Sequence, residues 1–320
     1  MKAAIWYGPQ DLRIEDIETP TAGAGEIVVK VGAATTCGSD FKAYRFGHPV
    51  LAPFAKCPFG HEMAGTVVEV GPGVVNVAPG DRVVAANSAP CGECFFCMRQ
   101  QPDLCEHPVY CKGAFAEFVR IPASIVRLKC HKIRDDLPFI TAAVAEPLSC
   151  VVNALDRITP ERGERVAIIG AGSAGRMFEQ LLSRRECEVA MVTRDPSTLE
   201  AARHLNGGRG PDIVIEAVGK SETWEAAVSL VRKGGKVCLF GGCARGSRVS
   251  LDTYKLHYEK LTLYGVFHHT PTSFREAVSM LERRIVDAGP LLAGQRPLAA
   301  LPQILREGLV KKPLKIAIVP

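Results

Sequence analysis

Four cysteines crowded into one short segment constrain this chain more than any other feature of its sequence. They stand within fifteen residues, with the spacing C-x2-C-x2-C-x7-C, at Cys91, Cys94, Cys97 and Cys105. Four thiolates so close together can fill the tetrahedral shell of one structural Zn²⁺. The segment also contains proline and glycine, so we expect a loop that needs such a staple to be ordered. The sequence therefore predicts a zinc-binding lobe over residues 88–108.

Disulfide bonds are the alternative use of these four thiols. The chain begins MKAAIWYGPQDLRIEDIE, which alternates like a β-strand and contains no long apolar run. We therefore expect neither a signal peptide nor a membrane span, and a reducing, cytoplasmic compartment. Twelve cysteines in a chain of that kind indicate metal ligands among them rather than disulfides.

The composition is that of an ordinary globular protein. The chain has 320 residues, enough for two domains, with 47% hydrophobic and 23% charged residues. Its net charge of +5 comes from basic residues scattered along the sequence. Doublets such as Arg184-Arg185 and Lys311-Lys312 are typical of solvated faces, so we expect no nucleic-acid partner.

Two patterns divide the chain. Residues 1–147 contain short β-type runs broken by glycine and proline, such as Glu26–Val31, Thr66–Val70 and Asp81–Ala85. These runs predict an all-β, barrel-like domain, and residues 269–320 return to mixed structure with a helix near Ser273–Arg284. Residues 148–268 alternate between strand and helix patterns, which predicts an α/β fold with a parallel, doubly wound sheet of Rossmann type.

One departure from the complete Rossmann pattern concerns the strand count. The expected strands are Arg165–Gly170, Glu188–Thr193, Asp212–Ala217, Lys236–Phe240 and Leu261–Gly265. The expected helices run after the first strand through Arg185, after the second through Leu205, and over Glu222–Leu230. Only Asn206–Pro211 separates the second helix from the next strand, where a complete six-stranded fold needs on the order of twenty more residues. We therefore predict about five parallel strands, without the usual third strand at the edge.

A glycine motif directly follows the first of these strands and opens a helix. Gly170-Ala-Gly172-Ser-Ala-Gly175 reads G-x-G-x-x-G. The first glycine permits a tight turn, the second lets backbone approach a pyrophosphate, and the third packs helix against strand. A turn that merely needs small residues is the alternative. In this context the motif predicts a bound dinucleotide, whose contacts we expect at Gly170, Gly172, Ser173, Ala174, Gly175 and Val218.

The end of the second strand bears on which dinucleotide is bound. Arg194 lies nineteen residues after Gly175, where an NAD-binding chain usually has an acidic residue. An arginine there favours the 2′-phosphate of NADP. The neighbouring Asp195 leaves NAD open, because its carboxylate could turn inward and accept the ribose hydroxyls.

Two short motifs in the β-rich domain supply further metal-ligand residues. They are Cys37-Gly-Ser39-Asp and Gly60-His61-Glu62. A cysteine, a histidine and one or two carboxylates that converge make a catalytic zinc site with one open position. Separately, a buried cysteine is usually a core residue and a lone histidine is usually just hydrogen-bonded. Their combination with the four-cysteine segment and the glycine motif favours catalysis.

Together with Glu146-Pro-Leu, these motifs resemble those of the zinc-dependent medium-chain dehydrogenases, most closely the sorbitol, or polyol, dehydrogenase branch. The resemblance covers nearly the whole chain. It implies a GroES-like β-barrel catalytic domain interrupted by the nucleotide-binding domain. It implies that Cys37, His61 and Glu146 bind a catalytic zinc, with Glu62 either a direct ligand or acting through water. With the lobe, it implies two zinc ions per chain.

The implied chemistry is hydride transfer between a secondary hydroxyl of a polyol or sugar derivative and NAD(P). Ser39 is expected to take the alcohol proton. Lys42 stands where the family often continues the proton relay with a histidine, and His268 stands where polyol enzymes tend to have an arginine, so the exact polyol stays open. Cys150, four residues after Glu146, is out of register for a zinc ligand and is expected to be a core residue.

Other hypotheses remain open from the sequence. L-Threonine and simple secondary alcohols are rival substrates within the enzyme class. A non-catalytic dinucleotide-binding redox sensor predicts decay of Cys37, His61 or Glu146, and all three are present. We also expect a homodimer or homotetramer, because the sheet edge left by the missing strand needs a cover.

Overall fold

The chain forms two compact units in the computed structural model, which describes residues 1–47, 56–310 and 313–320. Unit 1 contains Met1–Ser149 and Thr270–Pro320, and unit 2 contains Cys150–His269. Unit 1 is thus discontinuous in sequence. The Lys311-Lys312 doublet lies outside the described residues.

Unit 1 is built mainly from antiparallel strands. Its largest sheet has seven strands in the order β10-β6-β5-β3-β17-β16, with β9 also paired to β3. Two smaller sheets have the orders β2-β1-β4 and β7-β8. The strands are β1 (Lys2–Gly8), β2 (Asp11–Asp16), β3 (Ile27–Thr35), β4 (Cys57–Pro58), β5 (Met63–Val70), β6 (Arg82–Ala85), β7 (Ser88–Ala89), β8 (Val109–Tyr110), β9 (Phe118–Ile121), β10 (Cys130–Lys132), β16 (Leu292–Pro297) and β17 (Lys315–Val319).

Strand β3 is the centre of the large sheet, because it is apolar along most of its length and is covered on both faces. It pairs with β5, β9 and β17, and its residues Ile27, Val29 and Ala34 are fully buried. Strand β17 comes from the C-terminal segment. The sheet therefore joins the two parts of unit 1 through backbone hydrogen bonds, such as that from the amide of Thr36 to the carbonyl of Ile316 at 3.0 Å.

The helices of unit 1 are short. They are α1 (Gly38–Phe46), α2 (Ala123–Lys129), α3 (Phe139–Ala142), α10 (Pro271–Glu282) and α11 (Leu301–Gly308), with 3-10 turns η3 (Gly289–Leu291) and η4 (Leu298–Ala300). Helix α4 (Ala145–Ile158) runs from unit 1 into unit 2. The expected C-terminal helix is α10. The N-terminal segment forms the hairpin of β1 and β2.

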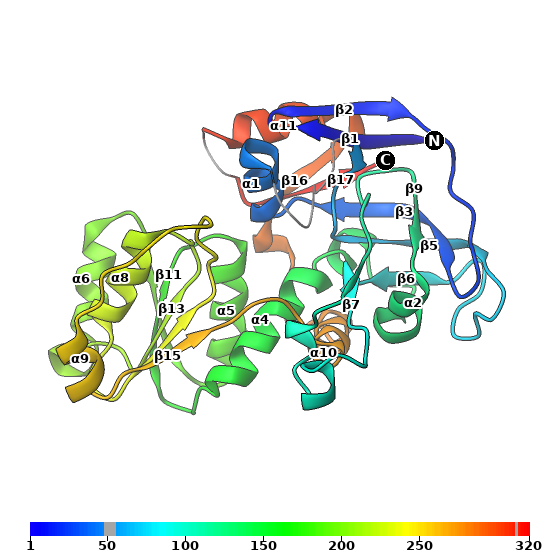
Figure 1. Cartoon of the computed structure of the whole chain (residues 1–320). Coiled ribbons are helices and arrows are strands. Elements are labelled where there is room, and N and C mark those ends of the chain that lie inside the picture. Colours follow the sequence, from blue (N-terminus) through cyan, green and yellow to red (C-terminus); the bar gives the residue numbers. More distant parts are fainter. Residues whose placement is uncertain (48–55, 311–312) are drawn as a thin grey trace. The chain divides into compact units, whose positions relative to one another are not determined.

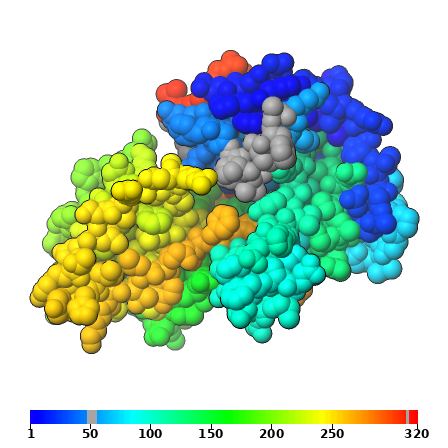
Figure 2. Space-filling view, in the orientation of Figure 1, coloured from blue at the N-terminus to red at the C-terminus, as the bar shows by residue number. Residues whose placement is uncertain are grey.

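The four-cysteine segment is more ordered than the predicted loop. It contains the 3-10 turns η1 (Cys97–Arg99) and η2 (Pro102–Leu104), and its two ends pair as β7 and β8. Proline fits the first turn of a short helix, so the prolines of this segment do not exclude 3-10 turns. Residues around number 100, cyan to teal in the space-filling view, lie at the surface (Figure 2). The expectation of a loop without helices is therefore wrong, because the segment contains two 3-10 turns.

Unit 2 is a parallel sheet with helices packed around it, among them α5, α6 and α8 (Figure 1). The strand order is β12-β11-β13-β14-β15, and every pair is parallel. Its strands are β11 (Arg165–Ile169), β12 (Glu188–Val192), β13 (Ile213–Glu216), β14 (Lys236–Leu239) and β15 (Thr262–Gly265). Its helices are α5 (Ser173–Arg184), α6 (Pro196–Arg203), α7 (Leu205–Gly208), α8 (Ser221–Leu230) and α9 (Thr253–Tyr258).

The prediction of five parallel strands without the third is confirmed. Among the described residues, β12 pairs only with β11, so it is the edge where a further strand would add. The six-residue link is a tight turn instead of a crossover. Within it Asn206 has φ 55° and Gly207 has φ 66°, left-handed conformations that asparagine and glycine tolerate best.

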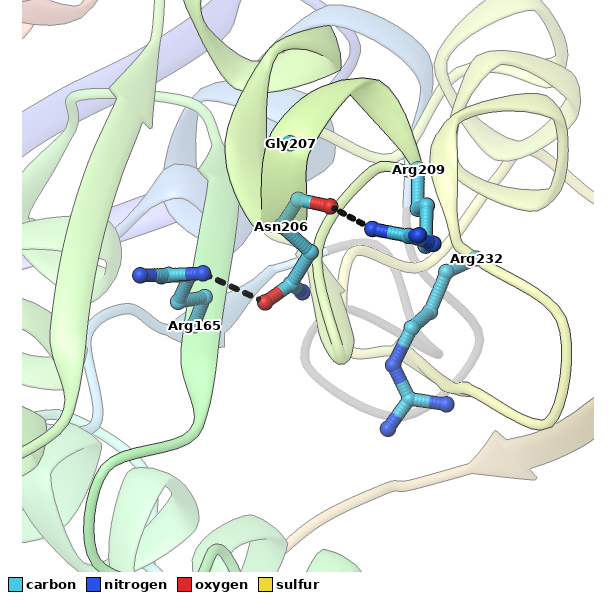
Figure 3. A pocket seen from close by; sticks show the side chains of 5 residues that line it. All are labelled: Arg165, Asn206, Gly207, Arg209 and Arg232. Atoms are coloured by element: carbon cyan, nitrogen blue, oxygen red, sulfur yellow. Dashed lines mark hydrogen bonds between the residues drawn. The ribbon is translucent and has the colours of Figure 1, made fainter.

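The side chain of Asn206 fixes this link. Its Oδ1 accepts from Arg165 Nη1 at 2.7 Å (Figure 3), and its Nδ2 donates to the carbonyl of Gly210 at 2.9 Å. The same amide lies 3.3 Å from Asp212 Oδ2. The link is thereby tied to the first residue of β11 and to the residue that precedes β13.

One segment, Phe139–Ile158, is long and apolar enough by composition to cross a membrane, with a mean hydropathy of 1.3. However, 67% of that window is buried inside the protein. Burial of that extent is typical of a core helix, so the segment is weak evidence for a membrane span.

Replacement of Asn206 should destabilise unit 2. Asn206→Ala removes the side-chain hydrogen bonds of Asn206. It also leaves alanine in the left-handed region with no side-chain bond to offset the strain, so the free energy of unfolding should fall by about 1–3 kcal/mol. Asn206→Gly relieves the backbone strain and should cost less than alanine. Urea unfolding followed by Trp224 fluorescence, in a Trp6→Phe background, measures both changes. An alanine variant as stable as the parent would show that the link does not depend on this side chain.

Candidate active site and cofactor site

Three side chains with metal-binding atoms converge in unit 1. The candidate ligand atoms of Cys37, His61 and Glu62 all lie within 4.8 Å of one another. His61 and Glu62 are buried, and Cys37 is half-buried. A thiolate, an imidazole and a carboxylate at this spacing fit a mixed zinc shell.

Local structure places each of these residues. Cys37 is the N-cap of α1, and its amide donates to Asp40 Oδ2 at 2.7 Å. His61 and Glu62 lie between β4 and β5, directly after Gly60. Gly60 has φ 94°, and a Cβ on it would lie 2.4 Å from the ring of Phe115. The turn that presents His61 therefore requires glycine.

The ring of His61 is oriented by Asp40. His61 Nδ1 lies 3.1 Å from Asp40 Oδ1, and both side chains are nearly completely buried. Burial opposes protonation, but the Asp40 carboxylate outweighs it and holds the pKa of His61 well above its usual 6.5. With Nδ1 turned toward Asp40, Nε2 is the nitrogen available to a metal.

Glu62 is held by a buried ion pair. Lys315 Nζ lies 2.6 Å from both carboxylate oxygens of Glu62, and Thr35 Oγ1 donates a short hydrogen bond to Oε2. Lys315 also donates to the carbonyl of Thr36 at 3.1 Å. Burial opposes the charge on Lys315, but Glu62 raises the pKa of that ammonium above its usual value. Neither Thr35 nor Lys315 was among the predicted site residues.

Glu146 lies in the first turn of α4, and its side chain is buried. Asn87 Nδ2 donates to Glu146 Oε1 at 2.9 Å. The pKa of Glu146 is raised to about 7, mainly by burial; Glu62 and Asp40 act in the same direction as burial, and His61 and Lys315 oppose it. Glu146 therefore belongs to the same electrostatic cluster, although its oxygens are outside the 4.8 Å group.

The charges of this cluster fit a bound dication. Asp40, Glu62 and Glu146 are three buried carboxyl groups, and Cys37 can add a thiolate. Lys315 and a protonated His61 balance only part of that negative charge. A buried excess of negative charge is costly in an apolar surrounding, and Zn²⁺ would relieve it. The residues present therefore fit a zinc ion.

Of the other predicted catalytic residues, Ser39 lies close to His61, whereas Lys42 and His268 lie elsewhere. Ser39 Oγ lies 3.4 Å from His61 Nε2, within reach of the same centre. Lys42 is exposed on α1. His268 belongs to unit 2, where its ring stacks on His269 with centroids 4.1 Å apart. Cys150 is half-buried, rather than fully buried as expected of a core residue.

The four cysteines of the lobe are brought together as a closed group. All four Sγ atoms lie within 4.8 Å of one another. Cys91 Sγ is 3.5 Å from Cys105 Sγ and 3.9 Å from Cys97 Sγ, and all are free thiols. Sulfurs around one tetrahedral zinc lie about 3.8 Å apart, whereas a disulfide bond is about 2.05 Å. The geometry fits zinc.

Backbone amides also favour thiolates in the lobe. Cys91 N donates to Cys105 Sγ at 3.2 Å, and Glu106 N donates to Cys94 Sγ at 3.5 Å. The amide of Glu106 lowers the pKa of Cys94 to about 6, whereas burial raises that of Cys97 to about 12. Without a cation, only part of the group can ionise. A bound dication would stabilise all four thiolates.

The glycine motif has the geometry that a pyrophosphate needs. Gly170 has φ 115°, and a Cβ there would lie 2.8 Å from Val218 Cγ2. Gly172 has open space where a Cβ would stand, and a Cβ on Gly175 would lie 1.9 Å from the carbonyl of Gly170. Gly172 is the N-cap of α5 and has no side chain that could cap the first amides of the helix.

Glu216 supports the loop opposite the glycine motif and was not predicted. It ends β13, is fully buried, and its Oε1 accepts from the amides of Val218 and Gly219, each at 2.8 Å. Thr223 Oγ1 donates to the same oxygen at 2.7 Å. An acidic residue closing an apolar strand was the available sequence signal. Glu216 thereby fixes Val218 beside Gly170.

Arg194 and Asp195 have different settings at the end of β12. Both are exposed. Asp195 is the N-cap of α6: its Oδ1 accepts from Ser197 N at 3.0 Å, and that amide lowers the pKa of Asp195. Among the described residues, no ion pair engages Arg194.

Comparisons with known proteins agree with this architecture. The alcohol dehydrogenase GroES-like domain matches residues 23–134, and the zinc-binding dehydrogenase domain matches residues 162–283. D-Arabinitol dehydrogenase 1 of Uromyces fabae is 29% identical over 348 residues, which cover 100% of this chain and 97% of that protein. Sorbitol dehydrogenase of Bombyx mori is 31% identical over 267 residues, which cover 75% of this chain and 76% of that protein.

A solved structure is similar over the full length. It is a zinc-binding dehydrogenase of Sinorhizobium meliloti 1021 bound to NADP, with a TM-score of 0.91 and 25% identity, and the match covers 100% of this chain and 99% of that one. The first matched domain lies in unit 1, and most of the second lies in unit 2. The chain is an oxidoreductase that belongs to the zinc-type medium-chain alcohol dehydrogenase family.

Proposed function

We propose that this protein is a zinc-dependent, NAD(P)-linked dehydrogenase that oxidises a secondary hydroxyl of a polyol or sugar derivative. The observation that carries the proposal is the buried, acid-rich cluster of Cys37, His61, Glu62 and Glu146. The similarity to D-arabinitol and sorbitol dehydrogenases supports polyols as the substrate class. L-Threonine and simple secondary alcohols remain the rival substrates.

In this proposal each residue of unit 1 has a separate task. When bound, zinc supplies a Lewis acid for the substrate oxygen, and NAD(P) supplies the hydride acceptor. Ser39, next to His61 Nε2, takes the hydroxyl proton. Lys42 lies three residues further along α1 on the same helix face and is exposed, so it can pass that proton to solvent. His268 would help to select the substrate.

The cofactor in this proposal is NADP. Asp195 already caps α6 and would have to break that bond to reach a ribose hydroxyl. Arg194 is left to bind a 2′-phosphate through charge-assisted bonds. The similar structure from Sinorhizobium meliloti holds NADP. We also propose a cytoplasmic homodimer or homotetramer, since free thiols suit a reducing compartment and the β12 edge needs a cover.

A substrate panel tests the function. Sorbitol, D-arabinitol, other polyols, L-threonine and 2-propanol are each offered with NAD and with NADP, and reduced nicotinamide is followed by absorbance. The proposal expects polyols to give the highest kcat/KM. A higher kcat/KM for L-threonine or 2-propanol than for any polyol would show that the proposed substrate class is wrong. No turnover of any alcohol by zinc-loaded protein would favour the redox-sensor hypothesis.

The protein should contain two zinc ions per chain in separable sites. Cys37→Ser should leave one zinc and abolish turnover, and Cys97→Ser should leave one zinc and lower the midpoint of thermal unfolding. Cys130→Ser, a buried thiol of unit 1 outside both clusters, should keep two. The mixed-ligand site should lose zinc to a chelator before the four-thiolate site. Elemental analysis that finds at most one zinc in the zinc-supplied parent would contradict this assignment.

Glu146, rather than Cys150, should complete the catalytic shell. Glu146→Ala should lose the catalytic zinc or nearly all turnover, because it removes a carboxylate from the cluster. Cys150→Ala, one helical turn away on α4, should keep zinc and activity and lose only packing. Zinc content and kcat of the two variants decide the matter. The reverse pattern would make Cys150 the ligand.

Arg194 should determine the cofactor preference. Loss of an arginine–phosphate contact costs on the order of 1.5–3 kcal/mol, so Arg194→Ala should lower kcat/KM for NADP roughly tenfold or more and change that for NAD little. Asp195→Asn keeps a capping side chain and is the matched control, expected to leave the preference intact. An equal effect of Arg194→Ala on both cofactors would make the cofactor assignment wrong.

A further inference from the structure

A cluster of three arginines lies in unit 2, away from the glycine motif. An open surface depression of about 360 Å³ is lined by Arg165, Asn206, Gly207, Arg209 and Arg232 (Figure 3). This arginine pocket includes the link that replaces the third strand. Three guanidinium groups around one depression repel one another unless negative charge balances them.

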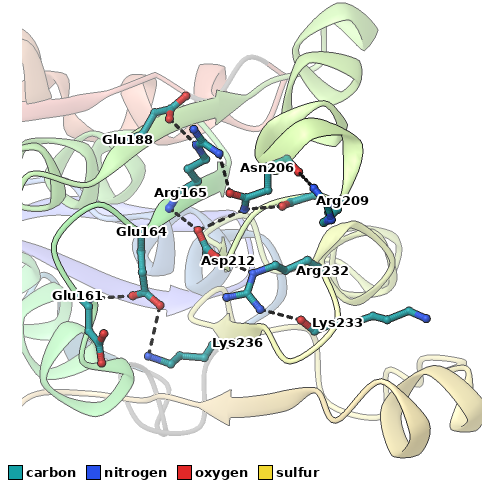
Figure 4. Close-up of polar contacts among 11 residues, drawn as sticks. Glu161, Glu164, Arg165, Glu188, Asn206, Arg209, Asp212, Arg232, Lys233 and Lys236 are labelled. Carbon is teal, nitrogen blue, oxygen red and sulfur yellow. Dashed lines mark hydrogen bonds and ion pairs between the residues drawn. The ribbon is translucent and has the colours of Figure 1, made fainter.

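The protein supplies two carboxylates, and both are already engaged (Figure 4). Glu188 Oε2 accepts from Arg165 Nε at 2.7 Å. Asp212 Oδ1 accepts from Arg232 Nε at 2.6 Å, and its Oδ2 accepts from the amide of Arg165 at 2.7 Å. Burial opposes the charge on Asp212, but these bonds and that from Asn206 lower its pKa, so it stays ionised at neutral pH.

Donors remain after these bonds are counted. A guanidinium group has five N–H donors. Among the described residues, neither Arg165 nor Arg232 uses its Nη2 group, and Arg209 makes a single bond, from Nη1 to the carbonyl of Asn206 at 3.0 Å. Arg209 has no ion pair within the described chain. Three positive charges thus face two negative ones, and unused donors come from three separate side chains.

The pocket is also partly organised in advance. Asn206 fixes Arg165, whose side chain is 41% exposed, and Asp212 fixes Arg232, whose side chain is 33% exposed. Side chains already held in place lose less conformational entropy when they bind a ligand. A carboxylate is satisfied by one guanidinium fork, whereas a phosphate group offers three oxygens to donors from several directions.

We propose that the arginine pocket binds a phosphate group, either inorganic phosphate or the phosphate of a small ester. The site is separate from the dinucleotide site. Arg165 begins β11 and the glycine motif follows its end, so five residues of strand, roughly 15 Å, lie between the two. The proposal goes beyond hydride transfer and does not depend on it.

Calorimetric titration tests the proposal. Inorganic phosphate and, separately, glycerol 3-phosphate are added at constant ionic strength to protein saturated with NADPH, so that the glycine motif is occupied. The expected result is one saturable site per chain. The tighter of the two probes identifies the source as free phosphate or a phosphate ester. Absence of saturable binding at millimolar probe, or its appearance only without NADPH, would overturn the proposal.

Variants separate the pocket from general charge. Arg209→Gln should weaken binding on the order of tenfold, because it removes a guanidinium with few structural bonds. Arg209→Lys keeps the charge without the fork and should weaken it less. Arg184→Gln, the same change at an exposed residue that ends α5, should leave affinity unchanged. Equal weakening by Arg184→Gln and Arg209→Gln would show nonspecific attraction only and would refute the site.

Discussion

The buried ion pair between Lys315 and Glu62 is the interaction on which the catalytic unit depends most. It joins the C-terminal strand β17 to the turn that carries His61, across 253 residues of sequence. Neither charge could stay buried alone, because removal of one partner of such a pair costs about 3–5 kcal/mol. Strand β17 therefore completes the large sheet and also fixes the Glu62 carboxylate beside Cys37 and His61.

The two metal-binding clusters of unit 1 use different electrostatics. In the lobe, four equivalent thiols compete for ionisation, and backbone amides stabilise only some of them, so the group needs a dication to be complete. In the cluster of Cys37, His61, Glu62 and Glu146, Asp40 orients the imidazole and Lys315 neutralises Glu62. The pKa of Glu146 is raised to about 7, mainly by burial. The first arrangement fits a closed structural zinc site, and the donor set of the second fits the catalytic site that we propose.

Much of this could be predicted from local sequence. The strands of unit 2 are short apolar runs such as Val166–Ile169, which have few alternatives to burial in a parallel sheet. The six-residue link was too short for a strand and its crossover, so the missing strand followed from chain length alone. The cysteine spacing was sufficient to indicate the lobe.

Other features could not be predicted in this way, for identifiable reasons. Lys315 carries no local pattern that points to Glu62; only the pairing of β17 with β3 brings them together.

The role of Asp195, by contrast, could have been predicted from the sequence, since Asp195-Pro196 is a typical N-cap followed by proline at the first helical position. The arginine pocket depends on Arg165 at the start of β11, Arg209 after α7 and Arg232 after α8, and no spacing rule connects them.

The central claim is that unit 1 holds one zinc in a sulfur-only shell and one in a mixed shell. Zinc X-ray absorption of the fully loaded protein measures the average shell directly. Five cysteine sulfurs shared by two ions predict about 2.5 sulfur neighbours per zinc near 2.3 Å, with the remaining nitrogen and oxygen neighbours at about 2.0–2.1 Å. A shell of four sulfurs per zinc, with no nitrogen or oxygen, would mean that only the lobe binds metal and would contradict the account.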